Sequence, residues 1–495
     1  MAAMLVAAAS SHVAAQTTQV TRAAKFTELP CTETYGKFDE STRAIARCGT
    51  VTVPQDRAAP NNTALQAVVL PVVVYASPTA HGTPLIFLAG GPGESAIDAA
   101  QQALLDTPLG QMLLRERPIV AFDRRGVTTD SHRASPDLSS VEYQARYPRK
   151  EAVAPLRDTV TRLTTFLRKR GVVANNFTTL AAIEDITDVI HALGYSRVVL
   201  LGASYGTREA LHFVRRHRDM VESIVLDGVA PPNAVSLLDS ATIVNAGRDV
   251  VSRLVEDCKQ DESCAADFAD LPKAVAWLGA DTLGALRRTA NFPDNGGWHT
   301  LGARGAAILS VIGMASTWEA IRAQAPAVLV EFARYDTLRS PLAARVLVAA
   351  AADPTLTGGH GERVPLVRYI AFCGDRPQGE PFVGDRTVCD ALGVPFSGPE
   401  AIARVTSDVP ALLISSGYDA QTPVRFADDA ARSLAHSFQV LFPMVGHVAI
   451  GRPIAMACAA VVIESFLGQP DRAPASTCVS SILPAFAPNR ISKEP

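Results

Sequence analysis

The chain has no long run of lysine and arginine residues. Its 495 residues are enough for two to three domains. The formal net charge is −3, and residues of both signs are mixed throughout. Two isolated dibasic pairs, Arg149-Lys150 and Arg215-Arg216, are expected on solvated helix surfaces. This charge pattern therefore gives no indication of binding to nucleic acid or to an anionic membrane surface.

The chain also lacks an apolar run that is long enough to cross a bilayer without charged residues, so no membrane span is expected. It has no Cys-x-x-Cys spacing, and no histidines cluster beside its cysteines, so neither a metal site nor a cofactor is expected. Its 48% hydrophobic residues are ample for a large globular core. The oligomeric state is left open by the sequence.

The first fifteen residues contain no Asp, Glu, Lys or Arg. Residues 4–9 form a short apolar core, and Val13-Ala14-Ala15 supplies small residues before Gln16, as in a cleavage site. We expect a signal peptide over residues 1–15 and export to a periplasm or out of the cell. The alternative is a disordered, alanine-rich N-terminus.

Eight cysteines fall into four pairs that are close in sequence. An even number in local pairs after a signal-like segment is typical of disulfides formed in an oxidising compartment. Other pairings are formally possible, and the alternative is eight reduced cysteines in the core. The expected pairs are Cys31–Cys48, Cys258–Cys264, Cys373–Cys389 and Cys458–Cys478.

Short, continuous apolar runs recur along the chain, as expected for strands buried on both faces of a parallel sheet. A helical pattern at steps of three and four lies between two of them, over residues 180–193. This alternation predicts an α/β fold with helices on both faces of the sheet. The strand candidates are 65–75, 84–88, 118–122, 198–201, 224–226, 411–414 and 438–442.

One connection is far longer than a crossover requires, since about 180 residues separate the strands near Leu226 and Ala411. Helical spacing within it is found at 241–255, 271–283, 302–314 and 340–351. We therefore expect a helical cap at 236–390, inserted between core segments at 24–235 and 391–495. The second core segment would include the C-terminal disulfide region.

The sequence Gly202-Ala203-Ser204-Tyr205-Gly206 directly follows a predicted strand and opens a helical pattern. In a strand–turn–helix of this kind, the serine is held in a strained turn that only glycines can flank without clashes. The turn lifts the hydroxyl clear of the sheet. Ser204 is therefore the candidate nucleophile, and the alternative is an ordinary glycine-rich turn.

A serine nucleophile requires a base and a carboxylate that orients the base, in the order Ser, Asp or Glu, His for this fold class. Asp419 and His447 each follow a predicted strand in that order. Asp227 is a competing acid, although we expect it to brace the Gly228–Pro232 loop. Three other histidines are interpreted as solvated or packing residues: His191, His212 and His360.

The oxyanion that forms during acyl transfer needs two donors. The backbone N–H of Tyr205 is one candidate. The other is the N–H of Gly91, within the Gly90-Gly91-Pro92-Gly93 turn that follows a predicted strand. The alternative for this turn is a plain tight turn.

These motifs resemble the proline iminopeptidase and tripeptidyl aminopeptidase branch of the α/β-hydrolases. The resemblance rests on Gly90–Gly93, Asp123-Arg124-Arg125-Gly126, Gly202–Arg208, Leu226–Val229, Asp419-x-x-Thr-Pro and the tail Cys458…Cys478. It implies an α/β-hydrolase fold, the triad Ser204, Asp419 and His447, an oxyanion hole at Gly91 and Tyr205, and exopeptidase activity on free N-termini. The chain departs from the family at Ala89, where relatives carry His, and after Gly126.

Three functions are consistent with these residues: a secreted serine aminopeptidase, an esterase or amidase with the same machinery, and a non-catalytic protein on a hydrolase fold. The complete triad disfavours the third. An aminopeptidase needs a carboxylate near the substrate ammonium. Asp375 is the candidate, although relatives carry Cys-x-Glu-Asp where this chain has Cys373-Gly374-Asp375-Arg376, and a surface ion pair is the alternative. The expected partner is a peptide or small acyl substrate.

Overall fold

A computed structural model describes residues 24–127, 161–234, 240–280, 288–303, 312–334, 366–377, 387–483 and Phe486, with gaps at 33–34, 36–37, 162–163, 166, 295–296, 314–315 and 317–318. The predicted signal peptide, the predicted helix at 340–351 and His360 lie outside these residues.

A nine-stranded sheet with the order β1-β2-β3-β5-β4-β6-β7-β10-β11 organises the fold. The first four strands in this order pair antiparallel, and those from β5 to β11 pair parallel. The predicted α/β-hydrolase architecture is confirmed. The strands are β1 Phe26–Leu29, β2 Ala46–Val53, β3 Val68–Tyr75, β4 Leu85–Leu88, β5 Ile119–Phe122, β6 Val198–Ala203, β7 Val221–Asp227, β10 Ala411–Ser416 and β11 Ser437–Phe442.

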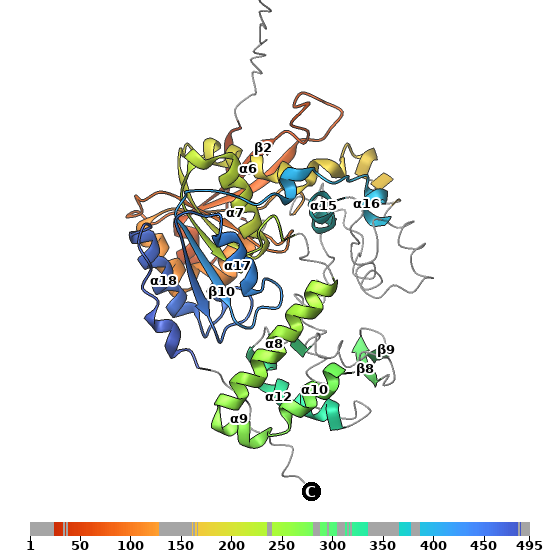
Figure 1. Cartoon of the computed structure of the whole chain (residues 1–495). Helices are drawn as coiled ribbons and strands as arrows, with labels where there is room; N and C mark the ends of the chain where they lie inside the picture. Colours follow the sequence, from red (N-terminus) through yellow and green to blue (C-terminus); the bar gives the residue numbers. More distant parts are fainter. Residues whose placement is uncertain are drawn as a thin grey trace, which may run out of the picture.

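The central strands are mostly apolar because helices cover both faces of the sheet. Every residue of β4, β5, β6 and β10 is buried. One hydrophobic core lies between the sheet and the face formed by α6, α7 and α17, and a second lies under α2, α3 and α18. These helices are α2 Ala96–Ala100, α3 Pro108–Glu116, α6 Thr179–Ala192, α7 Tyr205–Arg216, α17 Val424–Ala431 and α18 Met456–Gly468. Figure 1 shows the two layers on either side of the strands.

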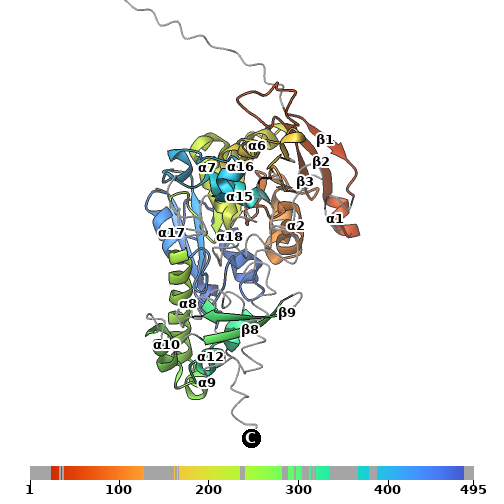
Figure 2. The same cartoon turned by 90° about the vertical axis from the view of Figure 1, so that its right-hand side faces the viewer.

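The long insertion between β7 and β10 forms two groups in its described parts (Figures 1 and 2). The first packs around its own apolar core, and its helices are α8 Ser240–Gln260, α9 Glu262–Asp267, α10 Leu271–Ala280 and α12 Glu319–Arg334. The second, α15 Leu366–Gly374 with α16 Thr387–Leu392, contributes to the core on the α6 and α7 face of the sheet. The second group thus shares a hydrophobic core with the sheet, although it lies before residue 390. The domain boundary at residue 390 stays a prediction.

The insertion also holds a two-stranded antiparallel sheet, β8 Arg288–Asp294 with β9 Gly297–Ala303. The helix predicted over 302–314 is wrong at its start, since residues 302 and 303 belong to β9. Spaced apolar residues in a short segment do not distinguish a helix from a strand.

All four predicted disulfides are present, with S–S distances of 1.95–2.03 Å. No cysteine is free. Three of the bridges span 16–20 residues and the fourth spans six. Bridges of this size restrain the unfolded chain by about 3 kcal/mol each, and by less for the shortest loop.

A thiol count tests this arrangement directly. Protein that is denatured without reductant is expected to release no free thiol to a colorimetric reagent, because all eight sulfurs are paired. Reduction before the assay should expose all eight and lower the melting temperature. Most of the eight appearing free without reductant would contradict the disulfides and the export that they suggest.

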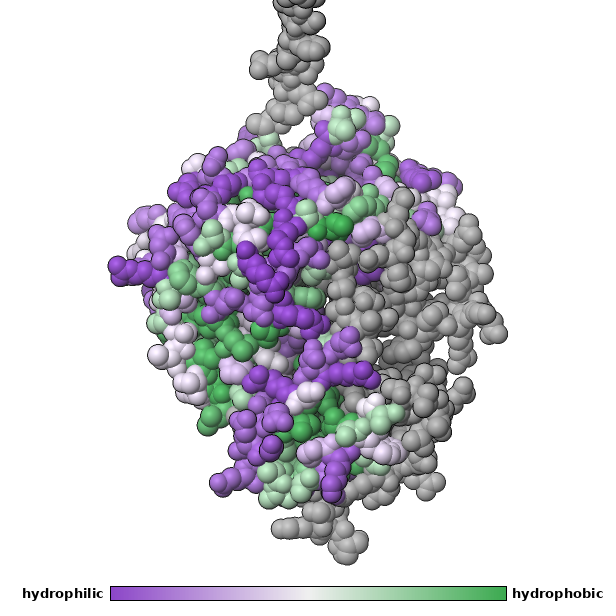
Figure 3. Space-filling model, viewed as in Figure 1, coloured by the Kyte–Doolittle hydropathy of each residue, from purple (hydrophilic) through white to green (hydrophobic). Residues whose placement is uncertain are grey.

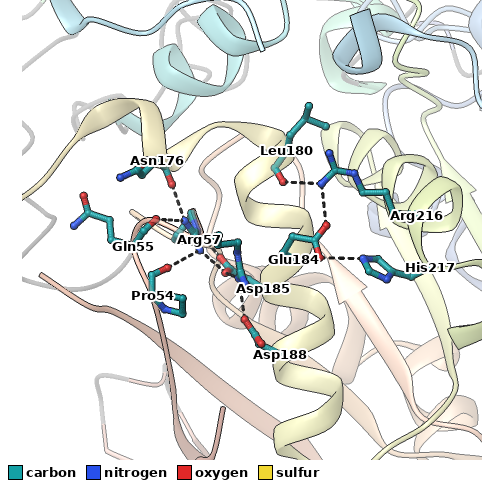
Figure 4. Close-up of polar contacts among 11 residues, drawn as sticks. Pro54, Gln55, Arg57, Asn176, Leu180, Glu184, Asp185, Asp188, Arg216 and His217 are labelled. Atoms are coloured by element: carbon teal, nitrogen blue, oxygen red, sulfur yellow. Dashed lines mark hydrogen bonds and ion pairs between the residues drawn. The ribbon is translucent and has the colours of Figure 1, made fainter. Parts of the chain in front are cut away.

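Buried ion pairs fix the loops around α6 (Figure 4). Arg125 is fully buried and donates to Asp185 through Nε at 2.7 Å and Nη2 at 2.6 Å. Arg57 contacts Asp185 at 2.5 Å and Asp188 at 2.8 Å. A buried guanidinium is costly unless a carboxylate pairs with it, and Asp185 is that partner for Arg125. Arg125 of the Asp123–Gly126 motif therefore has a structural role.

Among the described residues, no helix is both long enough and apolar enough to span a bilayer. Figure 3 shows hydrophilic residues over the upper part of one face and hydrophobic residues lower on the left, on the side of α18. Val461 of α18 is 46% exposed.

Candidate active site

Ser204 lies at the turn between β6 and α7, at the carboxyl edge of the sheet. Its backbone has φ 53° and ψ −119°, a left-handed conformation that a side chain rarely adopts. The Ser204 N–H donates to the Asp227 carbonyl at 2.8 Å, and its carbonyl accepts the Thr207 hydroxyl at 2.6 Å. These bonds hold a strained turn that the sequence predicted.

The two flanking glycines are required by close approach of the backbone. A Cβ at residue 206 would come within 2.0 Å of the Leu88 carbonyl oxygen, and one at residue 202 within 2.7 Å of the Gly206 carbonyl oxygen. Neither neighbour is a flexible side chain, so neither can move aside cheaply. The Gly-x-Ser-x-Gly spacing thus fits the packing of β4, β6 and α7.

His447 is hydrogen-bonded to Ser204 on one side and to Asp419 on the other. Its Nε2 lies 2.9 Å from Ser204 Oγ, and its Nδ1 lies 2.7 Å from Asp419 Oδ2. Both distances are normal for hydrogen bonds. The ring follows β11 and is 8% exposed, and its carbonyl accepts Arg452 Nε at 2.9 Å. A serine, an imidazole and a carboxylate therefore form one continuous hydrogen-bonded chain.

Asp419 is held as an ionised acceptor at the end of β10. Its Oδ1 accepts the backbone N–H groups of Gln421 and Thr422, both at 2.8 Å, and its Oδ2 accepts the Thr422 hydroxyl. Burial alone would raise the pKa of Asp419, but His447 and the Thr422 donors outweigh it and hold the pKa below its usual value.

Asp227, the competing acid, contacts the chain just beyond His447 and not its ring. Its two carboxylate oxygens accept the backbone N–H groups of Ala449 at 3.0 Å and Ile450 at 2.8 Å. It is fully buried, and that burial raises its pKa to about 6. Asp227 thus braces the loop after His447.

The expected brace of the Gly228–Pro232 loop by Asp227 is wrong. Arg208 holds that loop instead, through the carbonyls of Pro231 at 3.0 Å and Pro232 at 2.9 Å. The Asp227 side chain reaches the loop after β11 instead, because β7, β10 and β11 are neighbouring parallel strands.

The glycine-rich loop after β4 lies against the nucleophile. Gly91 has φ 104°, which glycine adopts without strain. A Cβ at Gly90 would come within 3.0 Å of Ser204 Cβ. The loop thus approaches Ser204 closely, and Tyr205, the other residue expected in the oxyanion hole, begins α7 directly after Ser204.

Asp375 contacts two side chains among the described residues, those of Arg208 and Tyr205. Its Oδ2 pairs with Arg208 Nε at 2.9 Å and accepts the Tyr205 hydroxyl. The Tyr205 hydroxyl also lies 2.6 Å from Thr179 Oγ1. Asp375 is 4% exposed, so the structure gives it a buried ion pair in place of the open carboxylate that we expected for an ammonium anchor. Its contact with Tyr205 makes it a positioning residue for the start of α7.

Sequence reasoning missed Glu94, which directly follows the Gly90–Gly93 turn. Although Glu94 is a solvent-exposed residue, the protein atoms around its carboxyl group desolvate it and raise its pKa, an effect that the Gly90 N–H, Arg368 and His447 partly offset. The signal available in the sequence was an acidic residue one position beyond a glycine-rich oxyanion loop.

A mainly parallel sheet that carries a strained serine, an imidazole and a carboxylate at the ends of three strands defines the class of α/β-hydrolases. The sequence matches the α/β-hydrolase fold family over residues 83–266. It also matches the TAP-like protein family over residues 378–478. The chain thus has the α/β-hydrolase fold, and its C-terminal region is similar to the TAP-like proteins.

The chain is also similar to curated proteins and to a solved structure. The serine protease Hip1 of Mycobacterium tuberculosis is 27% identical over 241 residues, which are 46% of this chain and 44% of Hip1. The chain thus spans less than half the length of that relative. A solved proline iminopeptidase from Mycobacterium smegmatis is 17% identical, with 85% of this chain and 98% of that chain covered and a TM-score of 0.38. Epoxide hydrolase 3 of Xenopus tropicalis is 42% identical over 52 residues, 10% of this chain and 14% of that protein.

Proposed function

We propose that this protein is an exported serine aminopeptidase that cleaves peptides from a free N-terminus through an acyl-enzyme. Ser204 is the nucleophile, His447 the general base and Asp419 the carboxylate that orients it. The observation that carries the proposal is the hydrogen-bonded chain from Ser204 Oγ through His447 to Asp419, with distances of 2.9 and 2.7 Å. An unassisted hydroxyl is too weak a nucleophile at neutral pH, and this chain activates it.

The reaction follows from these contacts. His447 Nε2 takes the Ser204 proton as Oγ attacks the scissile carbonyl, and then gives it to the leaving amine. The N–H groups of Gly91 and Tyr205 stabilise the oxyanion. Water, activated by the same imidazole, hydrolyses the ester to Ser204 and regenerates the hydroxyl.

Two observations support export and peptidase activity. Four disulfides in a chain of this size are typical of an oxidising compartment. The curated relative Hip1 is described as a serine protease. Whether cleavage releases one residue or three depends on where the substrate ammonium binds.

An esterase or amidase is the second candidate, and one observation favours it. Asp375, the acid expected to bind the substrate ammonium, is already paired with Arg208. Without an anchoring carboxylate, the site would favour an uncharged acyl compound over a peptide with a free amine.

Purified protein should be compared on aminoacyl 4-nitroanilides, tripeptidyl 4-nitroanilides and 4-nitrophenyl acetate, with Ser204→Ala as the blank. An aminopeptidase is expected to give a higher kcat/KM for a free-amine nitroanilide than for its N-acetylated form. Hydrolysis of the ester with no hydrolysis of either free-amine nitroanilide would favour the esterase.

A further inference from the structure

Glu94 places a second carboxylate close to the catalytic residues, in addition to that of Asp419. It follows the oxyanion loop directly, and the residue is exposed. The Gly90 backbone N–H hydrogen-bonds to its carboxylate. Among the described residues, no ion pair within 4.0 Å involves Glu94, although the charge of Arg368 on α15 acts on it. The carboxylate is thus fixed in place while it retains capacity to accept further hydrogen bonds.

The Glu94 carboxylate is close to the nucleophile. A Cβ built on Gly90 would lie 3.2 Å from Glu94 Oε2 and 3.0 Å from Ser204 Cβ, so both flank the same point of the loop. The charge of His447 also acts on Glu94. A negative charge at this place opposes the negative charge that develops on the substrate oxygen during attack. A cation in the substrate would remove that penalty.

The reach of a peptide decides which cation fits. The α-nitrogen of an amino acid lies about 2.5 Å from its own carbonyl carbon, and each further residue can add about 3.3–3.6 Å. The ammonium of a single N-terminal residue therefore stays beside Ser204, within reach of a carboxylate next to Gly90. The ammonium of an extended tripeptidyl group would lie roughly 9–10 Å from the scissile carbonyl.

We propose that the Glu94 carboxylate binds the α-ammonium group of the substrate's N-terminal residue and selects the release of one residue at a time. This inference rests on the proposed aminopeptidase function. Glu94 then acts as a substrate-binding residue that determines specificity, and the neutralisation of its charge by the ammonium makes catalysis faster with a charged substrate than with a neutral one.

Glu94→Gln tests the proposal, with Asp98→Asn as the matched control. Asp98 is an exposed acid in α2, and its replacement changes the net charge equally. Glu94→Gln is expected to lower kcat/KM for an aminoacyl 4-nitroanilide by about 10–100-fold, as for loss of a hydrogen bond between charged groups. The value for 4-nitrophenyl acetate should stay the same or rise. Asp98→Asn should match wild type on both.

Two further measurements keep the outcomes distinct. The melting temperature of Glu94→Gln should match wild type, and its rate of fluorophosphonate labelling should equal or exceed that of wild type, since neither requires a substrate ammonium. An equal loss on the nitroanilide and the ester, or a wild-type preference for tripeptidyl over aminoacyl nitroanilide, would overturn the role of Glu94 alone. Wild type that hydrolyses the ester through Ser204 but no free-amine nitroanilide would overturn the aminopeptidase function as well.

Discussion

Asp419→Asn is expected to lower kcat about ten-thousandfold with little change in KM. The Asp419 carboxylate accepts a hydrogen bond of 2.7 Å from the N–H at His447 Nδ1, which leaves Nε2 free to accept the Ser204 proton. An asparagine amide can donate to Nδ1 and so favour the wrong tautomer, and loss of the correct tautomer costs about this factor in a serine triad. Steady-state kinetics on the best nitroanilide, with the melting temperature of each variant, measures the effect.

Asp227→Asn is the matched control for this prediction. An asparagine retains one acceptor oxygen and presents an NH₂ group to one of the two N–H donors, Ala449 or Ile450. The loss should appear as destabilisation of about 1–3 kcal/mol, with a much smaller loss in kcat than for Asp419→Asn. If Asp227→Asn abolished turnover and Asp419→Asn did not, the acid would have to be reassigned to Asp227.

Ser204→Ala is expected to lower kcat about a millionfold, as removal of the nucleophile does in a serine protease triad. Within the described part of the chain, the Ser204 hydroxyl makes one hydrogen bond to a side chain, that of His447, so the fold should persist. Unchanged far-UV circular dichroism and melting temperature would separate loss of chemistry from loss of structure. Activity close to wild type in this variant would remove Ser204 from the mechanism.

The sequence was sufficient to predict the parts of the fold that have a local physical signature. A buried apolar strand followed by Gly202-x-Ser204-x-Gly206 predicts the strained turn, because only glycine tolerates the 2.0 Å and 2.7 Å approaches at residues 206 and 202. Most of the continuous apolar runs correctly predicted parallel strands, because helices cover both faces of those strands. The run at 65–75 instead forms β3, which pairs antiparallel with both of its neighbours. Local cysteine pairs likewise led to the four disulfides.

The contacts that depend on long-range packing could not be predicted. Asp375 and Arg208 are 167 positions apart in the chain, and no local pattern indicates that they pair. Asp227 reaches the loop after His447 only because β7 and β10 are neighbours. The β8–β9 pair and the position of Glu94 beside Ser204 likewise follow from tertiary structure, which overrides short sequence patterns.

Covalent labelling of the native protein with a fluorophosphonate is the most direct test of the central claim, that Ser204 is a nucleophile activated by His447. After digestion, mass spectrometry should find the phosphonyl group on Ser204, and both Ser204→Ala and His447→Ala should abolish labelling. The group found on another residue, or unchanged labelling in either variant, would contradict the proposed mechanism.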